Sequence, residues 1–423
     1  MDGTKRGGAG TGMGAGAGGL RAAAGPTGST VGVNLFALRS HNTALVLDLL
    51  RTAGARGISR LELAERTGLT PQAVSKITAR LREDGLAAEA GRRASTGGKP
   101  RTVLRLVPEA GHAAGVHLDR DELRTVLVDL TGTVVGERCA PLDLGAGADA
   151  VLTAVARETE ALVTDALGTS GTDALDTSGT DALDTSVRGS LGTSVRGSLG
   201  EVGSLLGLGI ALPGPLDHTR GVLHRVTGFP EWDGFPLRDA LARRVGVPVV
   251  VDKDTNAAAL GLAVGGEGGS FAYLHLGTGL GAGLVIGGSV HRGARTGAGE
   301  FGHQVIQLDG PVCGCGNRGC VEVLCLGAVA RGEPAEAARV LGEAAANLVG
   351  LLDIDLVLLG GRTVVADPSP FVRGVAAVLD TRARREGGRE GVVPVRVAAG
   401  GVRGVAEGAA QLLLAPLFGR GDG

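Results

Sequence analysis

The chain has 423 residues, of which 43% are hydrophobic and only 2% aromatic, and its formal net charge is −2. This length is enough for two or three domains, whose cores must be built mainly from Val, Leu and Ala. The sequence contains no run of about 18 apolar residues and no apolar signal core near its start. These features exclude a membrane span and predict a cytoplasmic protein.

Charge is distributed unevenly along the chain. Residues 31–107 carry 13 Lys and Arg against 6 Asp and Glu, so the remainder is acidic. A basic segment joined to an acidic one predicts contact with nucleic acid at one end only. Residues 1–30 are mostly Gly, Ala, Thr and Ser, which cannot bury enough apolar surface to order a chain, and they predict a disordered tail.

Three helices are predicted within the basic segment. Apolar residues recur at helical spacing in Asn34–Arg51. Ser59 and Glu62 have the spacing of a capping box for a second helix, which Gly68 ends. Pro71 occupies the favoured first position of a third helix. This order, with a glycine in the turn, predicts a winged helix-turn-helix DNA-binding domain over residues 31–108.

The third helix turns its apolar residues inward and leaves polar side chains outward. A basic hairpin, the predicted wing, follows it. Polar and basic donors on such elements suit base edges and phosphates in a major groove. The alternative is a solvated basic helix pair in an unrelated domain. The candidate DNA-binding residues are Gln72, Ser75, Lys76, Arg80, Arg92, Arg93, Lys99 and Arg101.

Strands and helices alternate over residues 109–423, which predicts an α/β domain. Its first part is interrupted by tandem copies of the octad GTDALDTS, and residues 163–203 are interpreted as a low-complexity insertion in a surface loop. The remaining segments are expected as strands at 113–117, 124–130, 134–138, 205–212, 248–251, 273–276 and 356–361, and helices at 149–167, 333–352 and 402–417.

Three of the five cysteines lie within eight residues of one another. Cys313, Cys315 and Cys320, together with His303, offer three thiolates and one imidazole, a complete tetrahedral set for a structural Zn²⁺ ion. The alternative is a Gly-rich loop with reduced cysteines. Glu300 and Glu322 flank this set and remain free to hold other groups, such as hydroxyls.

The segments Gly297–His303 and Cys313–Glu322 resemble the signature of the ROK family, which contains sugar kinases and sugar-responsive repressors. The resemblance runs from about Val31 to the end of the chain. It implies a winged helix-turn-helix followed by a two-lobed, actin-like, ribonuclease-H-like ROK domain. It also implies a double-stranded DNA operator, a small sugar or sugar phosphate, and a homodimer or dimer of dimers as partners.

Two stretches decide what the resemblance implies about chemistry. Residues 117–122 stand where ROK kinases have a phosphate-binding turn with two glycines, but here they contain three acids that are expected to repel phosphate. In Asp252–Ala258, Asp254 falls at the family's catalytic base and is interpreted as vestigial, while Lys253 replaces an Asn that normally contacts sugar. The implied ligand-binding residues are Asp254, Glu300, His303, Glu322 and Lys253.

Three hypotheses follow from these observations. The first, which we favour, is a sugar-responsive repressor of carbohydrate-uptake or catabolic genes whose ROK domain is not an enzyme. The second is an ATP-dependent sugar kinase that carries a DNA-binding domain. The third is a regulator whose ROK domain is only a ligand-independent dimerisation scaffold. The acidic turn argues against the second, and the retained set of Glu300, His303 and Glu322 argues against the third.

Overall fold

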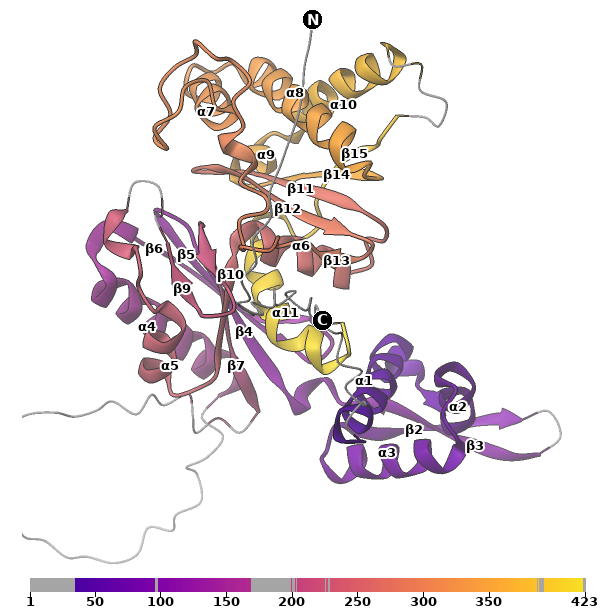
Figure 1. Ribbon diagram of the computed structural model, residues 1–423. Coiled ribbons are helices and arrows are strands. Elements are labelled where there is room, and N and C mark those ends of the chain that lie inside the picture. The colour runs from indigo at the N-terminus through magenta and orange to yellow at the C-terminus, as the bar shows by residue number, and fades with distance from the viewer. Residues whose placement is uncertain are drawn as a thin grey trace, which may run out of the picture. The chain divides into compact units, whose positions relative to one another are not determined.

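The structure, a computed structural model, describes residues 35–95, 98–168, 204–224, 229–385 and 392–420 together with positions 199, 202, 226 and 387 (Figure 1). The predicted disordered tail and the octad repeats lie outside the described residues. Helix α4 continues to Leu167, within the range expected to be the insertion. Among the described helices, none combines the length and apolar character needed to cross a membrane.

The N-terminal elements form the predicted winged helix-turn-helix. Their order is α1 (Leu35–Ala53), β1 (Ile58–Ser59), α2 (Arg60–Thr67), α3 (Pro71–Glu83), β2 (Ala87–Ser95) and β3 (Gly98–Leu106), and the three strands form a sheet in the order β1-β3-β2. The predicted capping box is confirmed. The Ser59 hydroxyl accepts a hydrogen bond from the Glu62 amide, and the Ser59 amide donates to Glu62 Oε2 at 2.8 Å. Gly68 ends α2 in the left-handed conformation, with φ 70°.

The first lobe of the following domain is a five-stranded sheet with helices against it. Its strands are β4 (His112–Leu118), β5 (Glu122–Asp129), β6 (Val134–Pro141), β7 (Leu205–Leu212) and β10 (Val249–Lys253), in the order β10-β7-β4-β5-β6. Strands β4, β5 and β6 are antiparallel neighbours. Strand β7 pairs in parallel with the other edge of β4, and β10 pairs in parallel with β7. Helices α4 (Ala148–Leu167) and α5 (Leu237–Val245) cover one face, and the short pair β8 (Leu216–Asp217) and β9 (Val222–Leu223) lies beyond β7 in the chain.

The second lobe repeats this topology. Its strands are β11 (Phe271–Leu276), β12 (Leu280–Ile286), β13 (Ser289–Val290), β14 (Leu356–Gly360) and β15 (Val395–Val397), again with three antiparallel neighbours and two parallel additions. Helices α7 (Val321–Ala330), α8 (Pro334–Leu352), α9 (Arg362–Ala366) and α10 (Pro368–Arg385) accompany them. Two lobes with one repeated sheet topology confirm the expected actin-like, ribonuclease-H-like fold.

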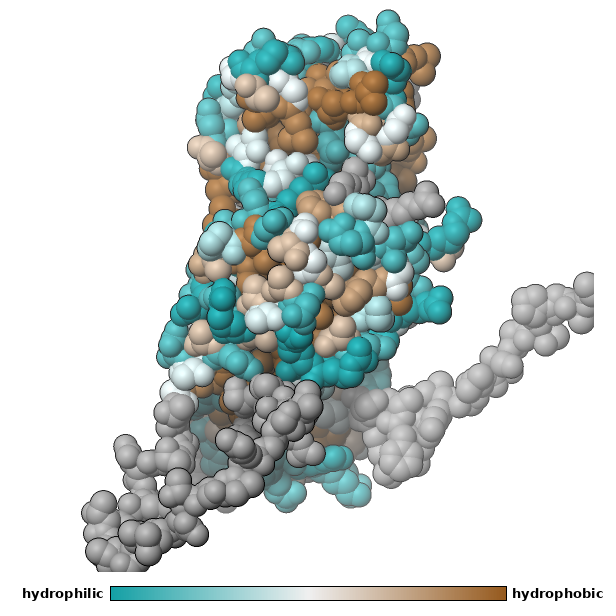
Figure 2. Space-filling view, turned by 90° about the vertical axis from the view of Figure 1, so that its left-hand side faces the viewer, coloured by the Kyte–Doolittle hydropathy of each residue, from teal (hydrophilic) through white to brown (hydrophobic). Residues whose placement is uncertain are grey.

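Helices α7 and α10 were not predicted from the sequence. Helix α7 is apolar on almost every side and lacks the 3.6-residue periodicity that marks an amphipathic helix. Only Val321, Cys325 and Ala328 of α7 are buried, and Leu351 near the end of α8 is 78% exposed. Figure 2 shows apolar side chains gathered over this helical layer of the second lobe. The layer therefore leaves apolar surface available for contact with a partner.

Two helices, α6 (Asp254–Val264) and α11 (Gly404–Leu417), pack against each other and join the lobes at their base. Helix α11 lies directly on β4 and β7 because two facing residues of these strands, Gly115 and Gly209, have no side chain. A Cβ atom at Gly115 would lie 2.0 Å from the Ala406 carbonyl oxygen, and one at Gly209 would lie 1.9 Å from that of Ala409. The C-terminal helix therefore depends on glycine at both positions.

Gly209→Ala is expected to destabilise the protein by at least about 1–3 kcal/mol, the usual cost of overpacking. The added methyl group meets backbone of α11, which cannot rotate away as a flexible side chain would. Urea unfolding of the purified variant measures this change. The matched control is Gly268→Ala, where a Cβ atom meets nothing within 4 Å and a change of no more than about 0.5 kcal/mol is expected. Equal midpoints for the two variants would contradict the packing argument.

Candidate functional site

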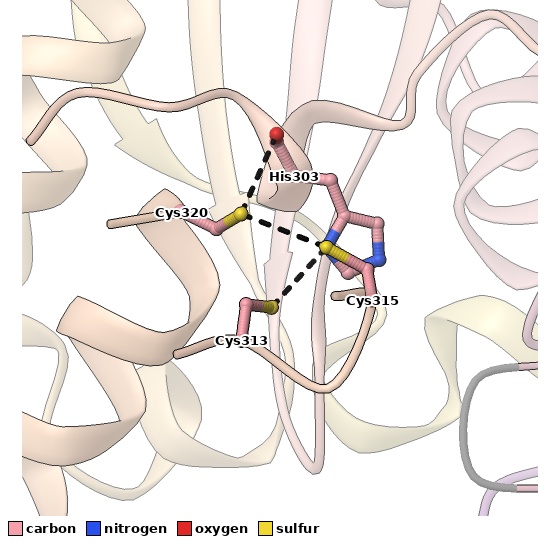
Figure 3. A group of neighbouring side chains, drawn as sticks. All are labelled: His303, Cys313, Cys315 and Cys320. Carbon is pink, nitrogen blue, oxygen red and sulfur yellow. Dashed lines mark hydrogen bonds between the residues drawn. The ribbon is translucent and has the colours of Figure 1, made fainter. Parts of the chain in front are cut away.

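The structure brings the four predicted metal ligands together. The ligand atoms of His303, Cys313, Cys315 and Cys320 all lie within 4.8 Å of one another (Figure 3). The Sγ atoms of Cys315 and Cys320 are 3.7 Å apart, and Cys313 Sγ is 3.7 Å from His303 Nδ1. These separations match the edge of a tetrahedron with metal–sulfur bonds of about 2.3 Å. The group can hold one metal ion without rearrangement.

The electrostatics of the cluster favour a cation. Burial, followed by hydrogen bonds and repulsion from the other two sulfurs, raises the pKa of Cys320 to about 12. Burial likewise raises the pKa of Cys313, whereas hydrogen bonds with the Asn317 backbone and the other two sulfurs outweigh burial and lower the pKa of Cys315. Two of the three thiols therefore stay protonated unless a metal ion compensates the thiolate charge. The donor set fits such an ion.

All five predicted ligand-binding residues line one cavity of about 70 Å³ between the lobes. Lys253 ends β10 and Asp254 begins α6, so both come from the base of the first lobe. Glu300 and His303 come from the short turn at Phe301–His303, and Glu322 from the first turn of α7. Nδ1 of His303 faces the sulfurs while the residue also lines the cavity, so the metal cluster and the cavity share this ring.

The polar groups of this cavity are held in place by specific contacts. Lys253 Nζ donates to the Ala298 carbonyl oxygen and to Glu300 Oε1, the latter at 3.1 Å. Glu322 Oε2 accepts a hydrogen bond from the Leu280 amide at 2.9 Å. Burial raises the pKa of Asp254 to about 7, partly offset by the hydrogen bond that its carboxylate accepts from the Thr255 amide. A carboxyl group with this pKa retains the properties of a general base.

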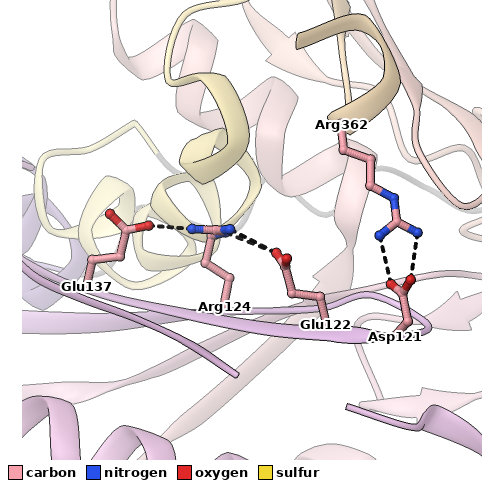
Figure 4. Close-up of polar contacts among 5 residues, drawn as sticks. All are labelled: Asp121, Glu122, Arg124, Glu137 and Arg362. Atoms are coloured by element: carbon pink, nitrogen blue, oxygen red, sulfur yellow. Dashed lines mark hydrogen bonds and ion pairs between the residues drawn. The ribbon is translucent and has the colours of Figure 1, made fainter. Parts of the chain in front are cut away.

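The acidic turn differs from its sequence-based interpretation, because its acids have partners. Arg362, at the start of α9, forms a bidentate ion pair with Asp121 at 2.9 and 3.0 Å (Figure 4). Glu122 pairs with Arg124 at 3.0 Å. Asp119 accepts a hydrogen bond from the hydroxyl of Thr278, in the glycine-rich turn of the other lobe. Asp121 and Glu122 therefore each have a cationic partner that the sequence-based interpretation did not include, whereas Asp119 has a hydroxyl donor.

These contacts nevertheless join the acidic turn of the first lobe to the second lobe. Asp119 and Asp121 lie in the acidic turn, Thr278 lies in the glycine-rich turn between β11 and β12, and Arg362 follows Gly360–Gly361 at the end of β14. The two turns are bonded to each other across the cleft. Sequence analysis did not identify Arg362 or Thr278, since both partners lie more than a hundred residues away along the chain.

The predicted DNA-binding residues fall on the third helix and the wing. Helix α3 exposes Gln72, Ser75, Lys76 and Arg80, while Val74 and Leu81 are buried. In the wing, β2 carries Arg92 and Arg93, and β3 carries Lys99 and the exposed Arg101. Arg93 and Arg101 are directly opposite each other in the strand register.

A winged helix-turn-helix joined to a two-lobed, sugar-kinase-like domain defines the class of protein. Residues 156–333 match the model of the ROK family, and residues 46–87 match a winged helix-turn-helix DNA-binding model. These residue ranges are therefore similar to a ROK family domain and, before it, to a winged helix-turn-helix.

Individual proteins are also similar to this chain. The xylose repressor of Caldicellulosiruptor bescii is 29% identical over 67% of this chain and 63% of its own length, so the match spans less than two thirds of that relative. The glucokinase of Thermotoga maritima is 41% identical over 28% of this chain and 38% of its own length. A ROK family transcriptional regulator, described as a homologue of the Escherichia coli Mlc protein, has a TM-score of 0.68 at 20% identity. That alignment covers 90% of this chain and 98% of the other, and it shows the shared fold.

Proposed function

We propose that this chain is a sugar-responsive DNA-binding regulator, a repressor of genes for carbohydrate uptake or catabolism. The observation that carries the proposal is the combination of an exposed polar recognition helix with one interlobe cavity lined by Lys253, Asp254, Glu300, His303 and Glu322. The similarity to a xylose repressor supports it. The sugar, or sugar phosphate, lies between the lobes, and its binding changes the affinity of the protein for its operator.

The DNA-binding surface consists of α3 and the wing. Polar side chains of α3 read base edges, and the basic residues of the wing contact phosphates. Arg93 and Arg101 are opposite each other in the strand register, which gathers basic residues on the wing. The protein acts as a homodimer, or a dimer of dimers, that places two α3 helices about 34–36 Å apart on a pseudo-palindrome. The exposed apolar surface of α7 and α8 supports an association of copies.

Arg101→Ala is expected to weaken binding to all DNA sequences about equally and to reduce the log–log salt dependence by about 0.9. Each phosphate contact releases about one condensed counterion from the DNA, so a variant that lacks one contact releases one counterion fewer. Fluorescence anisotropy on duplex DNA over a range of salt concentrations measures this slope. Arg373→Ala, in α10 of the second lobe, is the control and should leave the slope unchanged. The assignment of the phosphate-binding surface would be wrong if the slope stayed unchanged in every single alanine variant of Arg80, Arg92, Arg93, Lys99 and Arg101.

The metal at His303, Cys313, Cys315 and Cys320 is Zn²⁺ in this proposal. A closed Cys₃His set leaves no open coordination position, so the ion is structural and supplies no catalysis. By fixing the His303 ring through Nδ1, it leaves the other ring nitrogen to meet a sugar hydroxyl. Glu300 and Glu322 flank the same loop, so the ion holds both carboxylates toward one cavity.

The experiment that tests the proposal measures operator affinity of the purified protein with and without sugars. A duplex selected by the protein from random sequences serves as the operator. At least one sugar is expected to change the affinity by about 5–150-fold, the usual range of allosteric coupling. A protein that binds its operator tightly but responds to none of a broad panel of sugars and sugar phosphates would favour the dimerisation-scaffold hypothesis.

A kinase remains the second candidate because Asp254 has a pKa of about 7 and a glucokinase matches part of the chain. We expect no sugar phosphorylation, because the turn at residues 117–122 lacks the two glycines of the family's phosphate-binding turn and is bonded to the other lobe through Thr278 and Arg362. Coupled-enzyme detection of ADP release with ATP, Mg²⁺ and the sugar panel checks this. Sugar-dependent ADP release that Asp254→Asn abolishes would establish the kinase instead.

A further inference from the structure

The cavity between the lobes contains a buried ammonium group that the proposed function does not by itself explain. Lys253 is only 3% exposed, and its stem packs against Gly214, where a Cβ atom would lie 2.6 Å from Lys253 Cδ. An ammonium in a ligand pocket can serve as the receptor for a phosphate or carboxylate group. The question is whether the charge of Lys253 is available to a ligand.

The contacts of Lys253 indicate that its charge is already used. Its Nζ donates to Glu300 Oε1 at 3.1 Å and to the carbonyl oxygen of Ala298. Both acceptors belong to the second lobe, whereas Lys253 belongs to the first, so the pair also crosses the cavity. A buried ammonium held by a carboxylate and a carbonyl oxygen attracts a further anion much less than an isolated ammonium does.

The other charged groups lining the cavity give it a negative balance. Among the described residues, four carboxyl groups line it, Asp119, Asp254, Glu300 and Glu322, against two cations, Lys253 and Arg120. Even with Asp254 half protonated, because burial raises its pKa to about 7, the carboxylates outnumber the cations. Arg120 and Glu322 lie on the same side of Gly279. A Cβ atom at Gly279 would lie 3.7 Å from Arg120 Nη2 and 3.1 Å from Glu322 Oε2. His275 adds no charge, because burial lowers its pKa to about 4. A ligand that brought a phosphate or carboxylate would therefore meet more carboxyl groups than cations.

We propose that the Lys253–Glu300 pair restricts this cavity to uncharged sugars, and that Lys253 is a specificity-determining residue. The inference rests on the proposed sugar-sensing function and narrows its ligand class. Lys253 stays paired with Glu300 and presents its remaining N–H to a hydroxyl oxygen, while the carboxylates accept hydrogen bonds from sugar hydroxyls. Sugar phosphates and sugar acids are excluded by the surplus of negative charge rather than by size.

Titration calorimetry of the full, metal-loaded protein tests this with matched ligands. For each free sugar of the panel that binds, its phosphate ester and its uronic acid are compared, for example glucose, glucose 6-phosphate and glucuronate. The free sugar is expected to bind at least about tenfold more tightly than either anionic partner. Anionic partners that bind as tightly as the free sugar, or more tightly, would overturn the inference and leave sugar sensing intact. If no ligand of either kind binds, the proposed function fails, and the inference fails with it.

A variant gives the sharper test. Glu300→Gln releases the ammonium of Lys253, so the ratio of anionic to uncharged affinity is expected to rise by about tenfold, even if the free sugar itself binds less well. Glu343→Gln removes the same charge from an exposed position on α8 and should leave the ratio unchanged. A ratio that is equal in the parent and Glu300→Gln would overturn the role of the pair. Far-ultraviolet circular dichroism and zinc content confirm that both variants are folded.

Discussion

Replacing Cys320 by serine is expected to release the metal ion and to lower the melting temperature by about 10 °C or more. Cys320 is fully buried, its Sγ lies 3.7 Å from that of Cys315, and the residue immediately precedes α7. The loop from Gln304 to Cys320 is held by two isolated bridges and a few backbone hydrogen bonds, so an ion bound by its three cysteines would add a strong constraint. Loss of the ion therefore releases both the loop and the start of the helix that carries Glu322.

Metal analysis and differential scanning fluorimetry measure this effect together. The parent should contain about one zinc per chain, and Cys320→Ser much less. The matched control is Cys139→Ser, an exposed thiol on the edge strand β6, for which a change of no more than about 0.5 kcal/mol is expected. A parent without metal, or a Cys320→Ser variant as stable as Cys139→Ser, would contradict the structural role of the cluster.

What could be predicted from the sequence was mostly local. The capping box of Ser59 and Glu62, the turn glycine Gly68 and the helix start at Pro71 each depend on residues within a few positions of one another. The cysteine cluster is local in the same sense, since its four candidate ligands lie in one short loop. Such patterns report backbone geometry directly, which is why the winged helix-turn-helix was predicted almost to the residue.

What could not be predicted depends on contacts between distant parts of the chain. Asp121 and Arg362 are separated by 241 positions, and no local pattern of either residue indicates the other. For the same reason, the sequence suggested an acidic turn without partners, whereas the structure pairs Asp121 and Glu122 with arginines. Lys253 could be identified as a substitution in a family pattern, but its partner Glu300 became visible only with the two lobes folded together.

The double variant Glu300→Gln and Glu322→Gln is expected to lose the sugar response entirely while keeping its affinity for the operator. Both carboxylates line the cavity, and neither is among the four metal ligands. An amide retains one acceptor but lacks the charge that strengthens hydrogen bonds from hydroxyls, which are worth about 1.5–3 kcal/mol each when one partner is charged. Two such losses are enough to weaken sugar binding by roughly a hundredfold or more.

Control measurements separate this effect from a general loss of structure. Zinc content and melting temperature of the double variant should remain close to those of the parent. The variant Glu336→Gln with Glu343→Gln carries the same charge change on the exposed face of α8 and should respond to sugar as the parent does. The comparison therefore assigns any loss of response to the cavity rather than to net charge.

The central claim is that a sugar bound between the lobes changes operator affinity, and one anisotropy titration tests it most directly. Operator binding is measured with and without the activating sugar for the parent and for Glu300→Gln with Glu322→Gln. The account predicts a shift of about 5–150-fold for the parent, no shift for the double variant, and equal affinities of the two proteins without sugar. A double variant that responds to the sugar as the parent does would place the sensing site elsewhere and contradict the account.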